Sequence, residues 1–234
     1  DFSRSRGLGD VYKRQQVLNR LKSNIIATGY DGRLTSPDLH QALCEGLKDS
    51  GAKVINIGLG PTPMTYFAHY HLKADAVIMV TGSHNPSEYN GFKMVLNKHS
   101  FYAHDILSLQ KLIDQKKLES IEGEIIHKDI KQNYVERLLK NINLNKKIKI
   151  AWDVGNGAMG AVIKEVIKNL NNSENILIND KVDGNFPNHH PDPTVPKNME
   201  QLISVVKEKN CDVGLAFDGD GDRLGVVDNL GTLI

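Results

Sequence analysis

Two short polar loops hold the residues of this 234-residue chain that are best suited to chemistry. The first loop, residues 81–86, reads TGSHNP and directly follows an apolar run at 76–80. In open α/β sheets, ligands bind outside the carboxyl ends of the strands, where such a loop begins. Ser83 offers a hydroxyl nucleophile with His84 beside it, and Lys93 could return a cation to the same pocket. The loop lacks the G-x-S-x-G pattern of hydrolases, and a polar turn with a capping serine is the alternative.

The second loop, residues 218–223, reads DGDGDR and also follows an apolar run. The carboxylates of Asp218, Asp220 and Asp222 repel one another, and the intervening glycines let the backbone bend them around one centre. A hard divalent cation relieves that repulsion, which favours Mg²⁺ with a phosphate oxygen completing its shell. Arg223 suits a substrate phosphate or hydroxyl. The loop is not an EF-hand, since Arg223 stands where that motif needs glycine, and a solvated acidic turn is the alternative.

A third pattern, Gly155-x-Gly157-x-x-Gly160 with Asp180 beyond it, satisfies the dinucleotide-binding fingerprint. An NAD-type oxidoreductase is therefore a serious alternative function. The glycines could equally serve a sharp turn from a strand into a helix.

The adjacent pair His189-His190 lies in a proline-rich stretch, residues 186–196. The pair could line a cleft, although solvated loop histidines are the favoured interpretation. The histidines and cysteines of the chain lack the spacing of a zinc site.

Strands alternating with helices must position these loops, which predicts right-handed βαβ units and mainly parallel sheets. Two such runs meet near 127–131, so we expect two α/β domains, residues 17–128 and 129–234. Ser36 is expected to cap the first helix, with Pro37 at its first position. Strands are expected at 24–28, 53–57, 76–80, 91–96, 147–152, 175–178, 213–217 and 224–227, and helices at 36–51, from 62, near 105–115, around 134–139, at 158–170 and at 199–209.

The composition is that of an ordinary globular protein, with 40% hydrophobic and 24% charged residues and a net charge of +1. This balance argues against a nucleic-acid partner or an anionic membrane surface. No apolar run is long enough to span a bilayer. Cys44 and Cys211 have no redox or zinc spacing, which favours a reduced, cytoplasmic compartment.

Residues 1–16 have no useful apolar periodicity and lack the acid-poor, amphipathic pattern of a transit peptide. We expect this leader to be foreign sequence, such as translated adapter, joined to a coding fragment.

Together these segments resemble the α-D-phosphohexomutases, most closely the phosphomannomutase/phosphoglucomutase type, over essentially all of residues 17–234. The serine loop and the aspartate loop, in this order, are the specific features. The resemblance is carried by GYDGRLTSP from residue 29, GPTPMTYF from 60, TGSHNPSEYNGFK from 81, WDVGNGAMG from 152, VDGNFPNHHPDP from 182 and GLAFDGDGDRLGVV from 214.

The resemblance implies a role for each candidate residue. Ser83 would be phosphorylated in the resting enzyme, and Lys93 and His84 would transfer protons or stabilise charge beside the phosphoryl group. Arg223 would contact the sugar or its phosphate. Mg²⁺ would be held by the three carboxylates of the second loop, Asp218, Asp220 and Asp222, with an oxygen of the Ser83 phosphate as a further ligand. The glycine turn at 155–160 would be scaffold and would bind no dinucleotide.

The implied activity is isomerisation of hexose 1-phosphate and hexose 6-phosphate, of mannose or glucose, through a hexose 1,6-bisphosphate. The implied fold is two consecutive α/β/α three-layer domains with mixed, mainly parallel sheets, the first two of a four-domain enzyme. We expect the second domain to be truncated and the isolated fragment to be nearly inactive. The partner would be a small phosphosugar, with no nucleic acid or membrane, and the full-length form a monomer or dimer.

The chain departs from the family pattern at two places. Tyr30 stands where many relatives have a basic residue, and the leader replaces a segment with a Tyr-Asp-x-Arg-Gly-type motif. A non-enzymatic metal-binding module stays a third interpretation of the aspartate loop.

Overall fold

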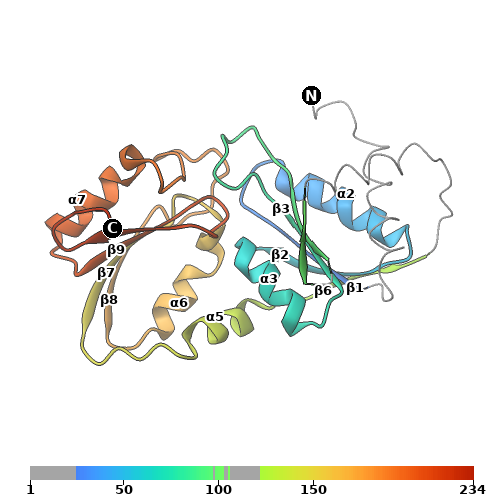
Figure 1. Cartoon of the computed structure of the whole chain (residues 1–234), viewed down its shortest axis with the longest axis horizontal. Coiled ribbons are helices and arrows are strands. Elements are labelled where there is room, and N and C mark those ends of the chain that lie inside the picture. The colour runs from blue at the N-terminus through green and yellow to red at the C-terminus, as the bar shows by residue number, and fades with distance from the viewer. Residues whose placement is uncertain (1–24, 97, 103–104, 106–121) are drawn as a thin grey trace.

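The computed structural model describes residues 25–96, 98–102, 105 and 122–234, and it contains two α/β domains side by side (Figure 1). The first domain has a six-stranded sheet in the order β5-β4-β3-β1-β2-β6. Strands β1, β2, β3 and β6 are parallel to one another, and β4 and β5 pair in antiparallel fashion at one edge. The strands are β1 (Ile25–Tyr30), β2 (Lys53–Leu59), β3 (Ala76–Val80), β4 (Phe92–Leu96), β5 (His99–Phe101) and β6 (Glu124–His127).

Helices α2 (Ser36–Lys48) and α3 (Thr62–His71) cover opposite faces of this sheet. Successive residues of a strand point to opposite faces, and β1 shows the consequence. Ile26 packs with Leu47 of α2, whereas Ala27 belongs to the cluster that contains Met64 of α3. All five residues of β3 are buried, as expected for a central strand covered on both sides.

The second domain repeats the three-layer arrangement around a four-stranded sheet in the order β10-β9-β7-β8. Only β10 is antiparallel to its neighbour. The elements of this domain are β7 (Ile148–Asp153), α6 (Ile163–Asn169), β8 (Ser173–Ile178), α7 (Glu200–Glu208), β9 (Val213–Phe217) and β10 (Leu224–Asp228), with 3₁₀ turns at Ala158–Ala161 and Pro196–Met199.

Helix α5 (Lys131–Leu139) joins the two domains and packs between α3 and α6 (Figure 1). Its Tyr134 contacts the ring of Phe67 on α3, with ring centroids 5.7 Å apart. Tyr134 and Trp152 belong to one buried hydrophobic cluster, which extends through both domains. The domains therefore share part of their core as well as a chain connection.

The predicted fold class is confirmed, and the strands at 76–80 and 213–217 have the expected bounds. The helix expected at 158–170 is a 3₁₀ turn followed by the short α6. The backbone N–H of Ala158 donates to the carbonyl of Gly219, which commits the first turn to a tertiary contact. Short edge strands β5 and β6 were not predicted, and most of the helix expected near 105–115 lies outside the described residues.

Ser36 is the first residue of α2 and not its N-cap, which is Thr35. Its hydroxyl instead donates to Asp31 Oδ1 at 2.5 Å and accepts from Asn90 at 2.8 Å. The prediction was wrong because a tertiary contact uses this hydroxyl.

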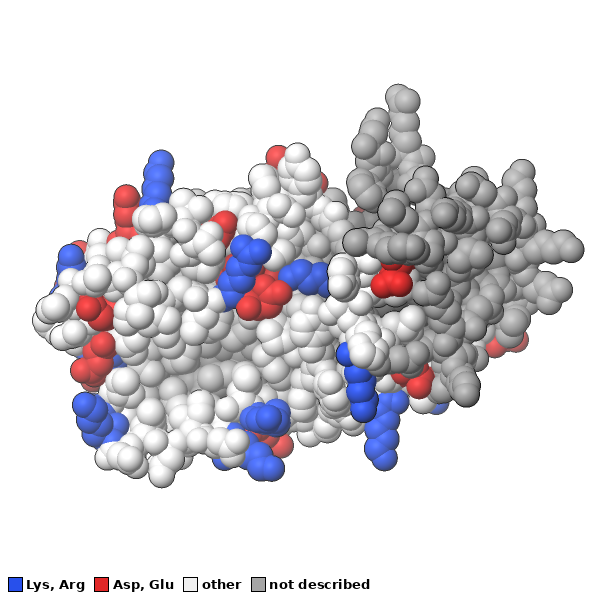
Figure 2. All heavy atoms as spheres, in the orientation of Figure 1, with Lys and Arg blue, Asp and Glu red and all other residues white. Residues whose placement is uncertain are grey.

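Charged side chains are interspersed on the face shown in Figure 2, which fits the near-zero net charge. Among the described residues, no helix combines the length and apolar character that a membrane span requires.

Candidate active site

The two polar loops meet at the carboxyl ends of β3 and β9, although they are far apart in the sequence. Ser83 Oγ donates to Asp218 Oδ2 at 3.3 Å. Lys93, on β4, places its Nζ 3.4 Å from Ser83 Oγ. The same ammonium group bonds to Asp220 Oδ2 at 2.7 Å and to Asp222 Oδ2 at 2.6 Å. The structure thus brings the serine, the lysine and all three aspartates into one site.

His84 contacts the serine with its side chain, whereas Arg223 contacts the site with its backbone. His84 Nδ1 lies 3.4 Å from Ser83 Oγ, within reach of the hydroxyl. Arg223 contributes through its backbone, since its N–H donates to Asp218 Oδ1 at 3.0 Å. Its side chain is exposed and is free to meet a ligand that approaches from solvent.

The three carboxylates form a group whose candidate ligand oxygens all lie within 4.8 Å of one another. Asp218 and Asp220 are fully buried. Burial and the neighbouring charge of Asp220 raise the pKa of Asp218 to about 7. For Asp220, burial acts in the same upward direction, but the Lys93 ammonium outweighs it and holds the pKa of Asp220 below its usual range.

One carboxylate oxygen of this group receives no hydrogen bond. Asp220 Oδ1 is buried and has no hydrogen-bond partner among the described residues. A buried carboxylate oxygen without a donor is costly, and a cation bound beside it removes that cost. An oxygen-only set of ligands of this kind fits a hard divalent cation such as Mg²⁺.

The backbone of Ser83 adopts a left-handed conformation, with φ of 51°. That conformation is uncommon for residues other than glycine and requires support from the surrounding structure. The N–H of Ser83 donates to Thr81 Oγ1 at 2.7 Å, and the Thr81 hydroxyl donates to Asp31 Oδ2 at 2.8 Å. Gly82 is required beside it, because a Cβ there would lie 2.5 Å from the guanidinium of Arg33.

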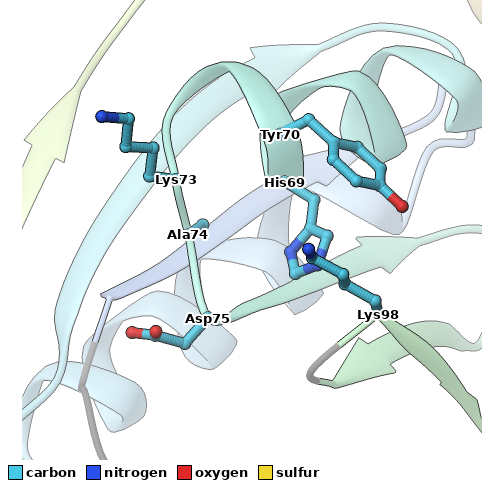
Figure 3. Close-up of a pocket in the computed structure, with 6 residues that line it drawn as sticks. All are labelled: His69, Tyr70, Lys73, Ala74, Asp75 and Lys98. Carbon is cyan, nitrogen blue, oxygen red and sulfur yellow. The ribbon is translucent and has the colours of Figure 1, made fainter.

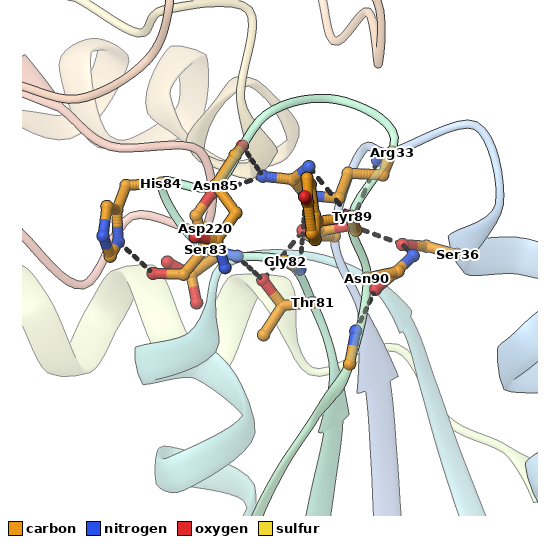
Figure 4. A network of polar contacts seen from close by, with 12 residues as sticks. Arg33, Ser36, Thr81, Gly82, Ser83, His84, Asn85, Tyr89, Asn90 and Asp220 are labelled. Carbon is orange, nitrogen blue, oxygen red and sulfur yellow. Dashed lines mark hydrogen bonds and ion pairs between the residues drawn. The ribbon is translucent and has the colours of Figure 1, made fainter. Parts of the chain in front are cut away.

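The side chain of Arg33, from the segment that follows β1, holds the serine loop together (Figure 4). Arg33 is 1% exposed. Its guanidinium is charge-paired with Asp31, with Nε 3.2 Å from Oδ2. Its Nη1 and Nη2 groups donate to loop carbonyls: Nη2 to Ser83 and Asn85 at 2.7 Å each, and Nη1 to Pro86 at 2.6 Å and Tyr89 at 3.0 Å.

Thr62, at the start of α3, holds the aspartate loop from the other domain. Its N–H donates to the backbone carbonyl of Asp220 at 2.8 Å, and its hydroxyl donates to Asp220 Oδ2 at 2.5 Å. Sequence reasoning assigned no role to Thr62, Asp31 or Arg33. The only available signal was that all three lie in segments that carried the family resemblance.

The glycine turn at 155–160 packs against the aspartate loop. A Cβ at Gly157 would lie 2.7 Å from the carbonyl oxygen of Gly219, and one at Gly160 would lie 2.4 Å from that of Asp180. The N–H groups of Gly157, Ala158 and Gly160 all donate to protein carbonyls. Because a dinucleotide fingerprint uses such amides for pyrophosphate, this turn does not support the oxidoreductase alternative.

His189 pairs with a buried carboxylate and is not simply a solvated loop residue. Its Nε2 lies 2.9 Å from Asp153 Oδ2, and its Nδ1 lies 3.0 Å from the carbonyl oxygen of His190. Since both ring nitrogens face acceptors, the geometry favours the doubly protonated ring. The hydrogen bond to Asp153 raises the pKa of His189 against the opposing effect of burial.

A separate hollow of about 420 Å³ lies at the amino end of β3, opposite the serine loop (Figure 3). Its lining residues are His69, Tyr70, Lys73, Ala74, Asp75 and Lys98. Asp75 Oδ2 is engaged by the N–H of Ile25, and burial together with the Lys98 charge lowers the pKa of His69. We place the candidate chemistry at the serine and aspartate loops, because a hydroxyl, an ammonium group and three carboxylates meet there.

Comparison with known proteins gives matches to both domains. The family described as "Phosphoglucomutase/phosphomannomutase, alpha/beta/alpha domain I" matches residues 5–120, and its domain II counterpart matches residues 132–231. The first match begins inside the segment 1–16 that we expected to be foreign. That expectation stays a prediction, because the segment lies outside the described residues.

Two curated relatives resemble the chain closely in sequence. The phosphomannomutase/phosphoglucomutase of Pseudomonas aeruginosa is 44% identical over 209 residues, which cover 89% of this chain and 45% of that protein. The phosphoglucomutase of Neisseria meningitidis serogroup B is 43% identical over 211 residues, which cover 89% of this chain and 46% of that protein. The chain therefore spans about half the length of these relatives.

A solved structure of a phosphoglucomutase/phosphomannomutase family protein from Burkholderia thailandensis has a TM-score of 0.90 and 38% sequence identity. The match covers all of this chain and 52% of that protein.

Substituting Arg33 by lysine tests the loop support. The charge is kept, but the planar fork that binds several carbonyls is lost, so Arg33→Lys should lower the free energy of unfolding by about 3 kcal/mol. Urea unfolding measures this loss. The exposed Arg137 is the matched control, and Arg137→Lys should change stability by less than about 0.5 kcal/mol. Equal stabilities for the two variants would contradict the assigned support.

The raised pKa of His189 predicts a pH-dependent contribution to stability. Because the folded pKa lies above the ordinary value of 6.5, this contribution is fully present below pH 6.5 and is lost as pH rises through the folded pKa. The stability difference between wild type and His189→Gln, measured by urea unfolding, should therefore shrink as pH rises from 5.5 to about 8.5. The exposed His127 offers the control variant His127→Gln, which should change the free energy of unfolding by less than about 0.5 kcal/mol.

Proposed function

The chain belongs to the phosphoglucomutase/phosphomannomutase family, and on this premise we propose that it is the half of a phosphohexomutase that holds the catalytic serine and the metal. The proposed reaction interconverts hexose 1-phosphate and hexose 6-phosphate, of glucose or mannose, by intramolecular phosphoryl transfer. The observation that carries the proposal is the contact of Ser83 Oγ with Asp218, with Lys93 3.4 Å from the same hydroxyl. The names of the relatives support a phosphosugar substrate.

Ser83 is proposed to alternate between hydroxyl and phosphoserine. The phosphoserine gives its phosphoryl group to a sugar hydroxyl, so that the Oγ–P bond breaks as a bond from phosphorus to the sugar oxygen forms, and the proton that the sugar hydroxyl loses is balanced by the one that Ser83 Oγ gains. The hexose 1,6-bisphosphate that results returns its other phosphoryl group to Ser83 Oγ. Both transfers need in-line positioning and neutralisation of charge on the equatorial phosphate oxygens.

Lys93 and His84 are proposed to serve the reacting oxygen directly. Burial lowers the pKa of Lys93, but the Asp220 and Asp222 carboxylates outweigh that effect and raise it. The residue therefore stays an ammonium group that can stabilise phosphoryl oxygens. His84 Nδ1, 3.4 Å from Ser83 Oγ, is placed to take or return the hydroxyl proton. Arg223 is proposed to bind the sugar or its phosphate through its exposed side chain.

Mg²⁺ is the proposed cofactor, held by Asp218, Asp220 and Asp222 with an oxygen of the phosphorylated Ser83. When bound, it would neutralise charge on the transferring phosphoryl group. The buried Asp220 Oδ1 without a protein partner supports this assignment. Hexose 1,6-bisphosphate is proposed as intermediate and activator.

We propose a cytoplasmic location, which the two buried free thiols of Cys44 and Cys211 support. A monomeric or dimeric full-length form stays a prediction.

Labelling of Ser83 tests the proposed function. The full-length protein, incubated with glucose 1,6-bisphosphate and Mg²⁺, should gain one phosphate on Ser83, mapped by peptide mass spectrometry. Ser83→Ala should remove the label, whereas the exposed Ser87 of the same loop allows a control, and Ser87→Ala should keep it. If the wild-type protein takes no phosphate on Ser83, the phosphohexomutase proposal fails and a metal-binding module is favoured.

Metal titration tests the aspartate loop independently of turnover. Asp220→Asn removes one charged ligand and should weaken Mg²⁺ binding at least tenfold in isothermal titration calorimetry. Lys93→Met should strengthen it, because the Lys93 ammonium competes for two of the carboxylates. The exposed Asp38 gives the control Asp38→Asn, which should bind like wild type. Unchanged affinity in Asp220→Asn would exclude this metal site.

A further inference from the structure

His190, in the proline-rich segment 186–196 of the second domain, contacts the serine loop of the first. Its Nε2 lies 2.6 Å from the backbone carbonyl oxygen of His84. A carbonyl oxygen can only accept, so the ring must donate through Nε2–H. This hydrogen bond crosses the domain boundary one residue beyond the proposed nucleophile, Ser83.

Within residues 83–86, this contact supplies a donor to the one backbone carbonyl that Arg33 does not bind. Arg33 donates to the carbonyl oxygens of Ser83, Asn85 and Pro86. The carbonyl of His84 lies between them in the sequence and points instead to His190. Every carbonyl from residue 83 to residue 86 therefore has a side-chain donor, and only the one at 84 takes it from the other domain.

The segment that carries His190 is also attached to the aspartate loop. The carbonyl oxygen of Pro191 accepts from the N–H of Gly219 at 3.2 Å. The carbonyl of His190 itself is bound by the His189 ring, which is anchored on the buried Asp153. The backbone that carries His190 is therefore held in place and already contacts Gly219, the residue between Asp218 and Asp220.

The serine loop and the aspartate loop are packed so closely that neither can move far without a change at the site. A Cβ on Gly219 would lie 2.5 Å from the carbonyl oxygen of Ser83, so the backbones of the two loops are in direct contact. A shift of the serine loop would change the distance from Ser83 Oγ to Asp218, which is 3.3 Å.

We propose that His190 is a positioning residue that fixes the serine loop of the first domain against the aspartate loop of the second. Its consequence for phosphoryl transfer rests on the proposed function, whereas its effect on the loop does not. Loss of the donor should let the loop sample other positions, and productive alignment of Ser83 should become rarer.

Hydrogen exchange of the full-length protein tests the effect on the loop without any reaction. In His190→Ala, the backbone amides of residues 82–85 and 87–90 should exchange about five- to tenfold faster than in wild type, as expected for loss of one hydrogen bond. His190→Gln keeps an N–H donor at the end of the side chain and should restore most of the protection. The exposed His127 supplies the control His127→Ala, which should leave the segment unchanged. Equal protection of residues 82–90 in wild type and His190→Ala would overturn the proposal.

The rate of Ser83 labelling by glucose 1,6-bisphosphate tests the functional consequence. His190→Ala should lower the maximal labelling rate about tenfold and leave the half-saturating sugar concentration nearly unchanged, because the His190 ring acts on the backbone carbonyl of His84. His190→Gln should recover most of the rate. A wild-type rate in His190→Ala, or a change confined to half-saturation, would overturn the positioning role. Absence of label in wild type would instead refute the proposed function, and the exchange experiment would still decide the effect of His190 on the loop.

Discussion

A buried guanidinium sets the conformation of the loop that contains the proposed nucleophile. Arg33 is removed from water, so every N–H that lacks a protein acceptor would carry a desolvation cost. Its Nη1 and Nη2 groups find acceptors in four carbonyls of the serine loop, and its charge is paired with the Asp31 carboxylate. Any other loop conformation would leave several of these groups unpaired. The left-handed backbone of Ser83 is therefore stabilised from outside the loop, by residues near the end of β1.

The carboxylates that face the serine loop come from the second domain. Several contacts hold the two domains together. Helix α5 contributes to a hydrophobic cluster that spans both domains. Thr62 binds Asp220 from the first domain, and His190 binds the His84 carbonyl from the second. The contacts run in both directions across the boundary. The relative position of hydroxyl and carboxylates is thus determined by packing and by paired polar groups together.

The fold and most of the candidate site could be predicted from the sequence for identifiable physical reasons. Central strands such as β3 are covered on both sides, so they read as continuous apolar runs that end where a ligand loop begins. The short edge strand β6 is only half-buried and has no such pattern. The roles of Arg33 and His190 could not be read in advance. Both side chains donate to backbone carbonyls, which every residue has, so no combination of residue types in the sequence indicates these contacts.

Charge balance explains why Lys93 must lie where it does. Two fully buried carboxylates beside a third would repel one another strongly at low effective dielectric. The Lys93 ammonium bonds two of the three, which keeps Asp220 ionised while the pKa of Asp218 rises. A divalent cation would satisfy the same carboxylates, including the unpartnered Asp220 Oδ1. Lys93 therefore serves two groups at once, because its ammonium is paired with two carboxylates and also lies 3.4 Å from the hydroxyl oxygen of Ser83, the proposed nucleophile.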